Sequence, residues 1–283
     1  MRNGTEQLLQ PAMETSSPVL VVERLSKAFG TRTAINEVSF TLAAGGFTAV
    51  LGPSGAGKTT LFRCITGLAR PDAGHVRFGD ADVSALEVQD RRKIAVVFQQ
   101  FNLVRRVTAL DNVLAGRLGY VPLWRGVLRQ FERADKLKAF ESLERVGMLE
   151  QAHQRADTLS GGQQQRVAIA RALAQEPRLI VADEPVASLD PSSAAGVLAL
   201  LKDIARTDRV TVICSLHQVG YARTFADRII GMAGGRLAMD AATATLDEAA
   251  FAALYATAPS EHSLASSGHG DPHAAGERTY PKA

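Results

Sequence analysis

The chain has 283 residues with 46% hydrophobic and 22% charged side chains, which is enough apolar material for a globular protein with a buried core. Its formal net charge of +3 is mild and no run of Lys and Arg concentrates it, so we predict no nucleic-acid partner. No apolar run reaches the roughly 18 residues of a membrane-spanning helix, and the distant Cys64 and Cys214 indicate buried thiols rather than a disulfide or a metal pair.

Strand and helix patterns follow one another from about Val19 to Tyr255. The first two, at residues 19–22 and 33–42, predict strands that no helix connects, and therefore a small antiparallel β portion. Further along, apolar strand patterns alternate with helical ones, which predicts an α/β fold with a mixed or parallel core sheet covered by helices. We expect these strands at residues 47–51, 94–98, 179–182 and 210–214, and the helices near residues 58–67, 132–146, 161–174 and 192–205.

Composition divides the chain into three parts. Residues 1–18 are polar and unpatterned, and residues 257–283 are rich in Ala, Ser, Gly, His and Pro, so we expect both ends to be flexible. Residues 19–256 form the predicted domain. Within it, residues from about 101 to 177 hold mostly helical patterns, which predicts a helical subdomain inserted in the sheet.

A glycine-rich loop directly follows the strand predicted at residues 47–51. Its spacing matches the phosphate loop G-x-x-x-x-G-K-[ST], and it opens a helix, so its backbone N–H groups and the positive helix end can hold phosphate oxygens. We expect Lys58 to neutralise the β- and γ-phosphates and the Thr59 hydroxyl to ligate Mg²⁺. The predicted nucleotide-binding residues here are Gly52, Pro53, Ser54, Gly55, Ala56, Gly57, Lys58, Thr59 and Thr60.

Two carboxylates end the apolar strand pattern at residues 179–182. Ligands of such sheets bind at the carboxyl ends of the strands, so we expect Asp183 to hold Mg²⁺ through its water shell and Glu184 to polarise the attacking water. An Asp-Glu pair alone more often caps a helix or a turn. The phosphate loop earlier in the chain favours the catalytic interpretation.

Two further polar residues end apolar strands in the same way, namely Gln99 and His217. Either residue alone would be a common structural side chain. Because four strands deliver polar groups to the edge that carries Lys58, we predict catalytic roles for both. Gln99 would reach Mg²⁺ or the attacking water, and His217 would donate a hydrogen bond to the γ-phosphate.

A second anion site is predicted where Leu159-Ser160-Gly161-Gly162-Gln163 precedes a helix, because Ser160 is a good N-cap and the glycines leave N–H groups free. These five residues resemble the signature sequence of ATP-binding cassettes, the nucleotide-hydrolysing subunits of ABC transporters. The resemblance extends from about Val19 to Tyr255 and implies the P-loop NTPase cassette fold, with ATP and Mg²⁺ as cofactors.

The resemblance also implies how the cassette works with its partners. Two copies pair head to tail, so that Ser160, Gly161, Gly162 and Gln163 cover the γ-phosphate of ATP bound to the other copy. Phe29 stands where the family stacks an aromatic ring on adenine. Gln99 links the γ-phosphate to the membrane subunits, and His217 is the switch histidine. Residues that contact the partner cassette are Ser188, Leu189 and Asp190.

Several stretches resemble the phosphonate-import cassettes in particular, although Gly220 departs from the acidic residue common there. These stretches are residues 99–103, 112–119, 124–128, 182–191, 215–219 and 226–230. We therefore expect the ATPase subunit of an ABC importer for phosphonate or a related phosphorus oxyanion, at the cytoplasmic face of the inner membrane. Its partners would be permease subunits and, through them, a solute-binding protein.

Three alternatives stay open at this stage. The chain could be a cassette-like accessory of a cytosolic phosphonate-breakdown complex, or an importer cassette for another small solute. A soluble mechanoenzyme of DNA repair or translation fits less well, because the phosphate loop and the signature are joined by too few residues for a coiled-coil arm. The region around Trp124 could also merely pack the helical subdomain.

Overall fold

The computed structural model describes residues 18–256, without the side chain of Leu123. The two ends predicted to be flexible lie outside these residues, apart from Pro18. Within them, no helix has both the length and the apolar character to cross a membrane.

A six-stranded sheet forms the centre of the molecule in the order β10-β9-β3-β8-β7-β6. Its strands pair in parallel except β10, which runs antiparallel on β9 at one edge. The bounds are β3 Phe47–Leu51, β6 Ile94–Phe98, β7 Leu179–Asp183, β8 Thr211–Ser215, β9 Arg228–Ala233 and β10 Arg236–Ala242. The predicted parallel sheet is confirmed, and its short continuous apolar strands are those expected of a sheet covered on both faces. Strands β9 and β10 were not predicted.

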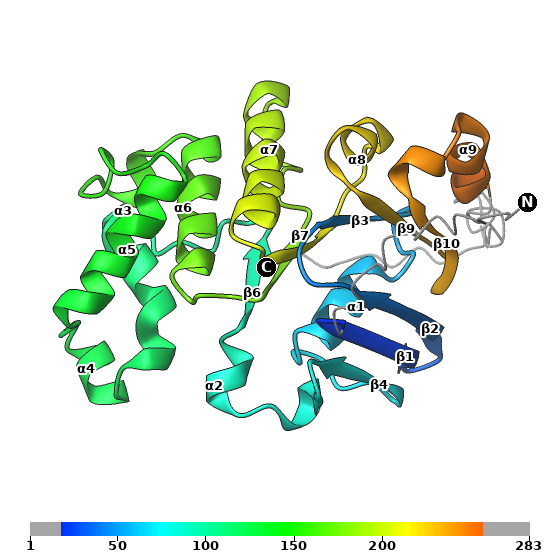
Figure 1. Cartoon of the computed structure of the whole chain (residues 1–283), viewed down its shortest axis with the longest axis horizontal. Coiled ribbons are helices and arrows are strands. Elements are labelled where there is room, and N and C mark those ends of the chain that lie inside the picture. Colours follow the sequence, from blue (N-terminus) through cyan, green and yellow to red (C-terminus); the bar gives the residue numbers. More distant parts are fainter. Residues whose placement is uncertain (1–17, 257–283) are drawn as a thin grey trace, which may run out of the picture.

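A four-stranded antiparallel sheet, in the order β2-β1-β4-β5, packs below the central sheet (Figure 1). Its strands are β1 Leu20–Phe29, β2 Arg32–Leu42, β4 Ala73–Phe78 and β5 Ala81–Asp82. Alternate residues of the central strands face it: Val50 joins the core that contains β1, β2 and helix α1 (Lys58–Ile65). Ala49 and Leu51 join the core on the opposite face. The predicted antiparallel portion is confirmed, with two more strands than expected.

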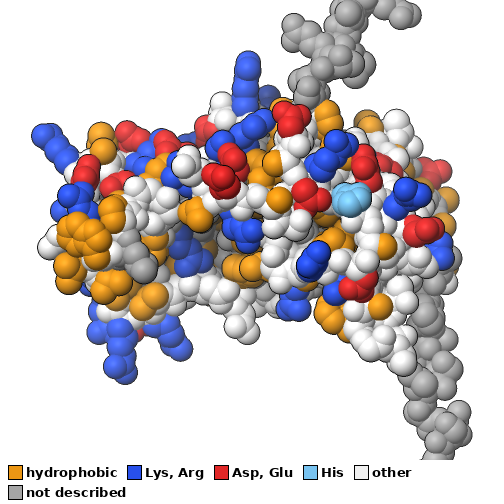
Figure 2. Space-filling view, turned by 90° about the horizontal axis from the view of Figure 1, so that it is seen from below, with side chains coloured by type: hydrophobic (Ala, Val, Ile, Leu, Met, Phe, Trp, Pro, Cys, Tyr) orange, Lys and Arg blue, Asp and Glu red, His pale blue; other side chains and the backbone are white. Residues whose placement is uncertain are grey.

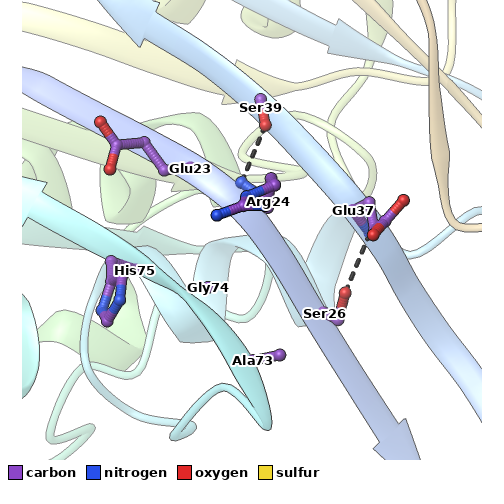
Figure 3. Close-up of a pocket in the computed structure, with 8 residues that line it drawn as sticks. All are labelled: Glu23, Arg24, Ser26, Glu37, Ser39, Ala73, Gly74 and His75. Atoms are coloured by element: carbon purple, nitrogen blue, oxygen red, sulfur yellow. Dashed lines mark hydrogen bonds between the residues drawn. The ribbon is translucent and has the colours of Figure 1, made fainter.

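Bulges in the antiparallel sheet open a polar cavity of about 510 Å³ (Figure 3). The pairing of β1 shifts register near Arg24, and the left-handed backbone at Arg24 and Glu37 turns their amides out of the ladder. Serine hydroxyls accept these amides: Arg24 N donates to Ser39 Oγ at 2.8 Å, and Glu37 N donates to Ser26 Oγ at 3.0 Å. The cavity contains none of the predicted site residues.

Helices cover the other face and the far end of the central sheet (Figure 1). Residues 101–177 hold α3 to α6 and no strand of either sheet, in keeping with the predicted helical subdomain. The remaining bounds are α2 Val88–Arg91, α3 Ala109–Leu114, α4 Leu123–Val127, α5 Arg133–Arg145, α6 Gly161–Leu173, α7 Pro191–Thr207, α8 Val219–Phe225 and α9 Glu248–Ala256. Short 3₁₀ helices are η1 Val83–Ala85, η2 Ala115–Tyr120, η3 Ala156–Thr158 and η4 Thr243–Thr245.

The surface carries charges of both signs side by side over much of the face seen in Figure 2, which agrees with the mild net charge. Hydrophobic side chains gather on this face at the end of the molecule formed by the helical region (Figure 2). Trp124 is 57% exposed, so it packs the helical region only in part.

A buried arginine ties the helical region together. Arg117, 8% exposed, donates from Nε to Asp135 Oδ1 at 3.0 Å and from Nη1 to the Ala174 carbonyl and the Glu176 carboxylate, both at 2.9 Å. Its guanidinium also stacks 3.6 Å from the centre of the Tyr120 ring, whose other neighbour is Arg92 at 3.7 Å. Because η2, α5 and the α6–β7 connection all meet here, the ion pair fixes how these segments pack.

Replacing this arginine should be costly. Arg117→Met leaves the buried Asp135 carboxylate without its main partner, and we expect the free energy of unfolding to fall by about 3 kcal/mol. Urea denaturation measures the change. Arg155→Met, which removes a solvent-exposed pair with Asp157, should leave stability nearly unchanged. An equal loss of unfolding free energy in the two variants would show that burial of the Arg117–Asp135 pair does not contribute to stability.

Candidate active site

Four parallel strands end at one edge of the central sheet, and each delivers a candidate side chain there. The register pairs Phe98 with Asp183, Asp183 with Ser215, and Ser215 with Val50. The residues that follow β3, β6, β7 and β8 therefore leave the sheet at the same level. This brings together the phosphate loop, Glu184 and His217, which line one cavity, whereas Gln99 leaves the sheet at the same level without lining it.

The phosphate loop fits only because two positions have no side chain. Gly52 has φ 150°, and a Cβ there would lie 2.2 Å from the Met232 carbonyl oxygen of β9. Gly57 has φ 101°, and a Cβ there would lie 2.4 Å from the Ala34 carbonyl oxygen of β2. Both contacts are too short for any Cβ, so the loop is wedged between the two sheets. Its amides are thereby held at the N-terminal end of α1.

Lys58 is the first residue of α1 and is 5% exposed. Its ammonium group donates to the Gly52 carbonyl at 2.7 Å and to the Pro53 carbonyl at 3.2 Å, which holds the side chain against its own loop. Burial lowers the pKa of Lys58, and the carboxylates of Glu184 and Asp183 act in the opposite direction. The charge thus lies between the phosphate loop and the two acids.

A cavity of about 420 Å³ lies over this loop. It brings the loop together with Phe29, which is 53% exposed, and with Glu184 and His217. Lys27 lies 5.5 Å from the centre of the Phe29 ring, and its ion pair with Asp72 at 2.7 Å holds the cation there. The lining residues are Phe29, Arg32, Ala34, Ser54, Gly55, Ala56, Gly57, Lys58, Thr59, Thr60, Glu184 and His217.

Glu184 is held in an unusual backbone conformation by its neighbours. Its φ of 49° lies in the left-handed region, which costs an ordinary residue free energy. Its amide donates to Ser215 Oγ at 2.8 Å, and the same hydroxyl donates to Asp183 Oδ1 at 2.7 Å. Nε2 of His217 lies 2.5 Å from Oε1 of Glu184. One serine therefore positions both acids, and the imidazole adjoins the second.

Two site residues escaped the sequence reasoning. Ser215 ends β8 directly beside Asp183, and the alignment of parallel strand ends could have suggested it. Arg32 lines the cavity from the first position of β2, with Nη2 3.1 Å from where a Cβ on Gly55 would be. No local pattern marks this arginine, because its role depends on how the two sheets pack.

Gln99 does not line the cavity. It is exposed at the end of β6, and the residues after it are anchored to the helical region. Arg171 of α6 donates to the Asn102 carbonyl at 2.6 Å and to the Phe101 carbonyl at 3.0 Å. The amide group of Asn112 also bonds both backbone groups of Val104. The segment after Gln99 thus connects the sheet edge to the helical region.

The signature residues lie outside the cavity of their own chain. Ser160 caps α6 in a reciprocal capping box: its hydroxyl accepts from Gln163 N, and its own amide donates to Gln163 Oε1 at 2.9 Å. A Cβ on Gly161 would meet Leu189, and one on Gly162 would meet Ser193. The signature and residues 188–190 therefore form one continuous surface, consistent with a role outside the cavity of the same chain.

Mg²⁺ suits the oxygen atoms that the site offers. The Thr59 hydroxyl is exposed at the cavity, and the Asp183 carboxylate is oriented by Ser215. Within residues 18–256, no group of three or more His, Cys, Asp or Glu side chains could hold a metal by itself. A few hard oxygen ligands supplemented by water and phosphate is the arrangement that Mg²⁺ prefers.

Comparison with known proteins agrees with this geometry. The profile of the ABC transporter family matches residues 35–187. The phosphonates import ATP-binding protein PhnC 2 of Rhodopseudomonas palustris strain BisB18 is 49% identical over 84% of this chain and 89% of that protein. The hypophosphite import ATP-binding protein HtxD of Stutzerimonas stutzeri is 49% identical over 83% of this chain and 70% of that protein.

Solved structures give the same result. A nucleotide-free ATP-binding cassette of an ABC transporter superposes with a TM-score of 0.72 at 28% identity, covering 84% of this chain and 94% of that one. A dimeric cassette, MJ0796, bound to ADP and Pi gives 0.66 at 33% identity, covering 79% and 98%. Fold and site together define a phosphate-loop ATPase of the cassette type. The chain belongs to the ABC transporter family, and it binds and hydrolyses ATP.

The Ser215 hydroxyl gives a direct test of how the acids are held. Ser215→Ala removes the only side-chain atom that bonds both Asp183 and the Glu184 amide within the described residues. Since hydrogen bonds to charged groups contribute about 1.5–3 kcal/mol, we expect kcat to fall about 10-fold or more. Phosphate release in steady state measures it. An unchanged kcat in a folded variant would refute this role.

The Phe29 ring is testable separately from the phosphate contacts. Stacking a base on an aromatic ring contributes about 1–3 kcal/mol, so Phe29→Ala should raise the Kd of ATP about 10-fold or more. Phe29→Tyr keeps the ring and should bind normally. Inorganic tripolyphosphate, which has no base, is the control ligand in isothermal titration. A similar loss for tripolyphosphate would mean that Phe29 shapes the loop instead of stacking.

Proposed function

We propose that this chain is the ATP-hydrolysing subunit of an importer for phosphonates or a related phosphorus oxyanion. The observation that carries the proposal is the likeness to import ATP-binding proteins over 84% of the chain. Two relatives at 49% identity are named for phosphonates and for hypophosphite, which are both phosphorus oxyanions. The exact solute is selected by other subunits in such a system, so no residue of the cassette needs to contact it.

The proposed reaction uses the groups at the sheet edge. The amides of residues 52–60 and the Lys58 ammonium bind the phosphates, and Phe29 stacks on adenine. Glu184 takes a proton from the attacking water while the water oxygen forms a bond to the γ-phosphorus. At the same time the bond between the γ-phosphorus and the bridging oxygen breaks, and that oxygen leaves with ADP. His217, beside Glu184, donates to a γ-phosphate oxygen. The shared cavity and the contact between His217 and Glu184 support these roles.

Thr59, Asp183 and Gln99 would hold Mg²⁺, with Asp183 acting through water. When bound, Mg²⁺ neutralises charge on the β- and γ-phosphates. The Ser215 hydroxyl donates to Asp183 Oδ1 and so orients that carboxylate, and Gln99 directly follows β6, the strand that pairs with β7. Oxygen donors at two strand ends and at the start of helix α1 support this assignment.

A second copy of the chain would complete the site. Gly161 and Gly162 supply backbone N–H groups at the start of α6, beside the capping box of Ser160 and Gln163, and none of these residues lines the chain's own cavity. In the proposed head-to-tail dimer they cover the γ-phosphate of ATP on the partner, and Ser188, Leu189 and Asp190 contact it. The dimeric structure of MJ0796 supports this arrangement.

The dimer would act on membrane subunits from the cytoplasmic face of the inner membrane. Permease subunits would respond to cassette closure through the segment after Gln99, which Arg171 and Asn112 anchor to the helical region. A solute-binding protein would deliver the solute to the permease. The import functions named for the relatives support these partners.

Uptake in cells tests the proposed function. In a deletion strain, wild type should restore growth on a phosphonate as sole phosphorus source, whereas Glu184→Gln should not, since loss of a general base lowers turnover by roughly 10²-fold or more. Growth on phosphate is the control. Uptake of radiolabelled phosphonate excludes a role in its breakdown, and labelled hypophosphite in the same strains shows which oxyanion is carried. Normal phosphonate and hypophosphite uptake in the deletion strain would refute the proposal.

Membrane pull-down separates the remaining alternative. An importer subunit should be recovered from detergent-solubilised membranes with permease subunits. Recovery with soluble phosphonate-breakdown enzymes and without any permease would instead identify an accessory of that pathway.

A further inference from the structure

The last described helix, α9, reaches the active site through one hydroxyl group. Tyr255 Oη donates to the His217 carbonyl oxygen at 3.3 Å. The backbone amide of Gly52, the first residue of the phosphate loop, faces Tyr255 Oη itself. Tyr255 therefore lies between the two halves of the site, one on β3 and the other on β8. No sequence pattern marked this residue.

Helix α9 is packed firmly enough to hold the hydroxyl in place. Phe251 and Leu254 are 4% and 3% exposed, and both belong to the core that contains β3, β7 and β8. Leu254 fills the space beside Gly231 of β9, where a Cβ would lie 2.9 Å from its Cδ1. Arg223 of α8 stacks 5.8 Å from the Phe251 ring. Figure 1 shows α9 over β9 and β10 at this end of the sheet.

The His217 carbonyl is a sensitive place for such a contact. Residues 216 and 217 connect β8 to α8, and the Leu216 amide still donates to the Val50 carbonyl of β3 at 3.1 Å. Beyond that bond the chain leaves the sheet, so the orientation of the His217 backbone decides where its imidazole lies. The imidazole is 2.5 Å from Glu184. A small rotation there would change the contact with the proposed general base.

We propose that Tyr255 is a positioning residue for ATP hydrolysis: its hydroxyl fixes the His217 backbone against the phosphate loop and so aligns the imidazole with Glu184. Burial raises the pKa of Tyr255, with the Gly52 amide acting in the opposite direction, so the phenol stays protonated and able to donate. This inference goes beyond the import proposal, because it concerns ATP hydrolysis whichever solute the importer carries. It rests on the roles proposed for Glu184 and His217.

Tyr255→Phe removes the hydroxyl and keeps the ring. We expect kcat for ATP hydrolysis to fall roughly five-fold with little change in KM, since one neutral hydrogen bond is lost and the phosphate contacts remain. The matched control is Tyr120→Phe, which removes a hydroxyl that donates to the Gln175 carbonyl at 2.8 Å in the helical region. That variant should keep the wild-type kcat.

The NMR signal of the His217 imidazole distinguishes positioning from a merely structural role of Tyr255, because a general loss of stability would not shift it. In NMR spectra of the full chain, the His217 ring resonance, assigned by its loss in His217→Gln, should shift in Tyr255→Phe and stay in place in Tyr120→Phe. An unchanged resonance and kcat in Tyr255→Phe would overturn the proposal, whatever the melting temperature does. Glu184→Gln is the reference: if it hydrolyses ATP at the normal rate, the role assigned to Glu184 fails, independently of Tyr255.

Discussion

The active site depends on the alignment of strand ends in the central sheet. Because β3, β6, β7 and β8 run parallel and pair without a register shift, the residues that follow them leave the sheet at one level. Hydrogen bonds between backbones thus decide that Asp183, Ser215 and the phosphate loop meet. Side chains then refine the arrangement: one hydroxyl bonds both Asp183 and the Glu184 amide. The site is built by the sheet before any ligand is considered.

The same alignment leaves the signature residues outside the cavity over the phosphate loop. The signature residues begin α6, which belongs to the helical region and not to the edge of the sheet. They pack against Leu189 and Ser193 and do not line the cavity over the phosphate loop. In the proposed head-to-tail pair, the cavity of one chain and the signature surface of the other would together enclose the nucleotide.

The sequence was sufficient where the physical signal is local. Three patterns can each be recognised within about ten residues. They are a phosphate loop after an apolar strand, acids at the end of another strand, and an N-cap before two glycines. Ser215, Arg32 and Tyr255 were missed because each acts across a contact between distant segments. Strands β9 and β10 were missed for a related reason: the weak pattern of β10 is stabilised by its antiparallel partner and not by its own composition. The solute cannot be read from the site at all, since no residue of it needs to touch the solute.

The cavity also spans the boundary between the two hydrophobic cores. Phe29 and Arg32 come from the antiparallel sheet, whereas Glu184 and His217 follow strands of the central sheet, and the phosphate loop lies wedged between Ala34 and Met232. In the proposed complex, the base contacts one sheet and the γ-phosphate contacts the edge of the other. In that complex, nucleotide binding would join two units whose cores are separate, and it would stabilise their arrangement in proportion to its affinity for that arrangement. Hydrolysis would then remove the γ-phosphate contact and leave the base contact intact. Because the two ends of the ligand would contact different parts of the fold, the proposed complex offers a way to convert the loss of one phosphate into movement.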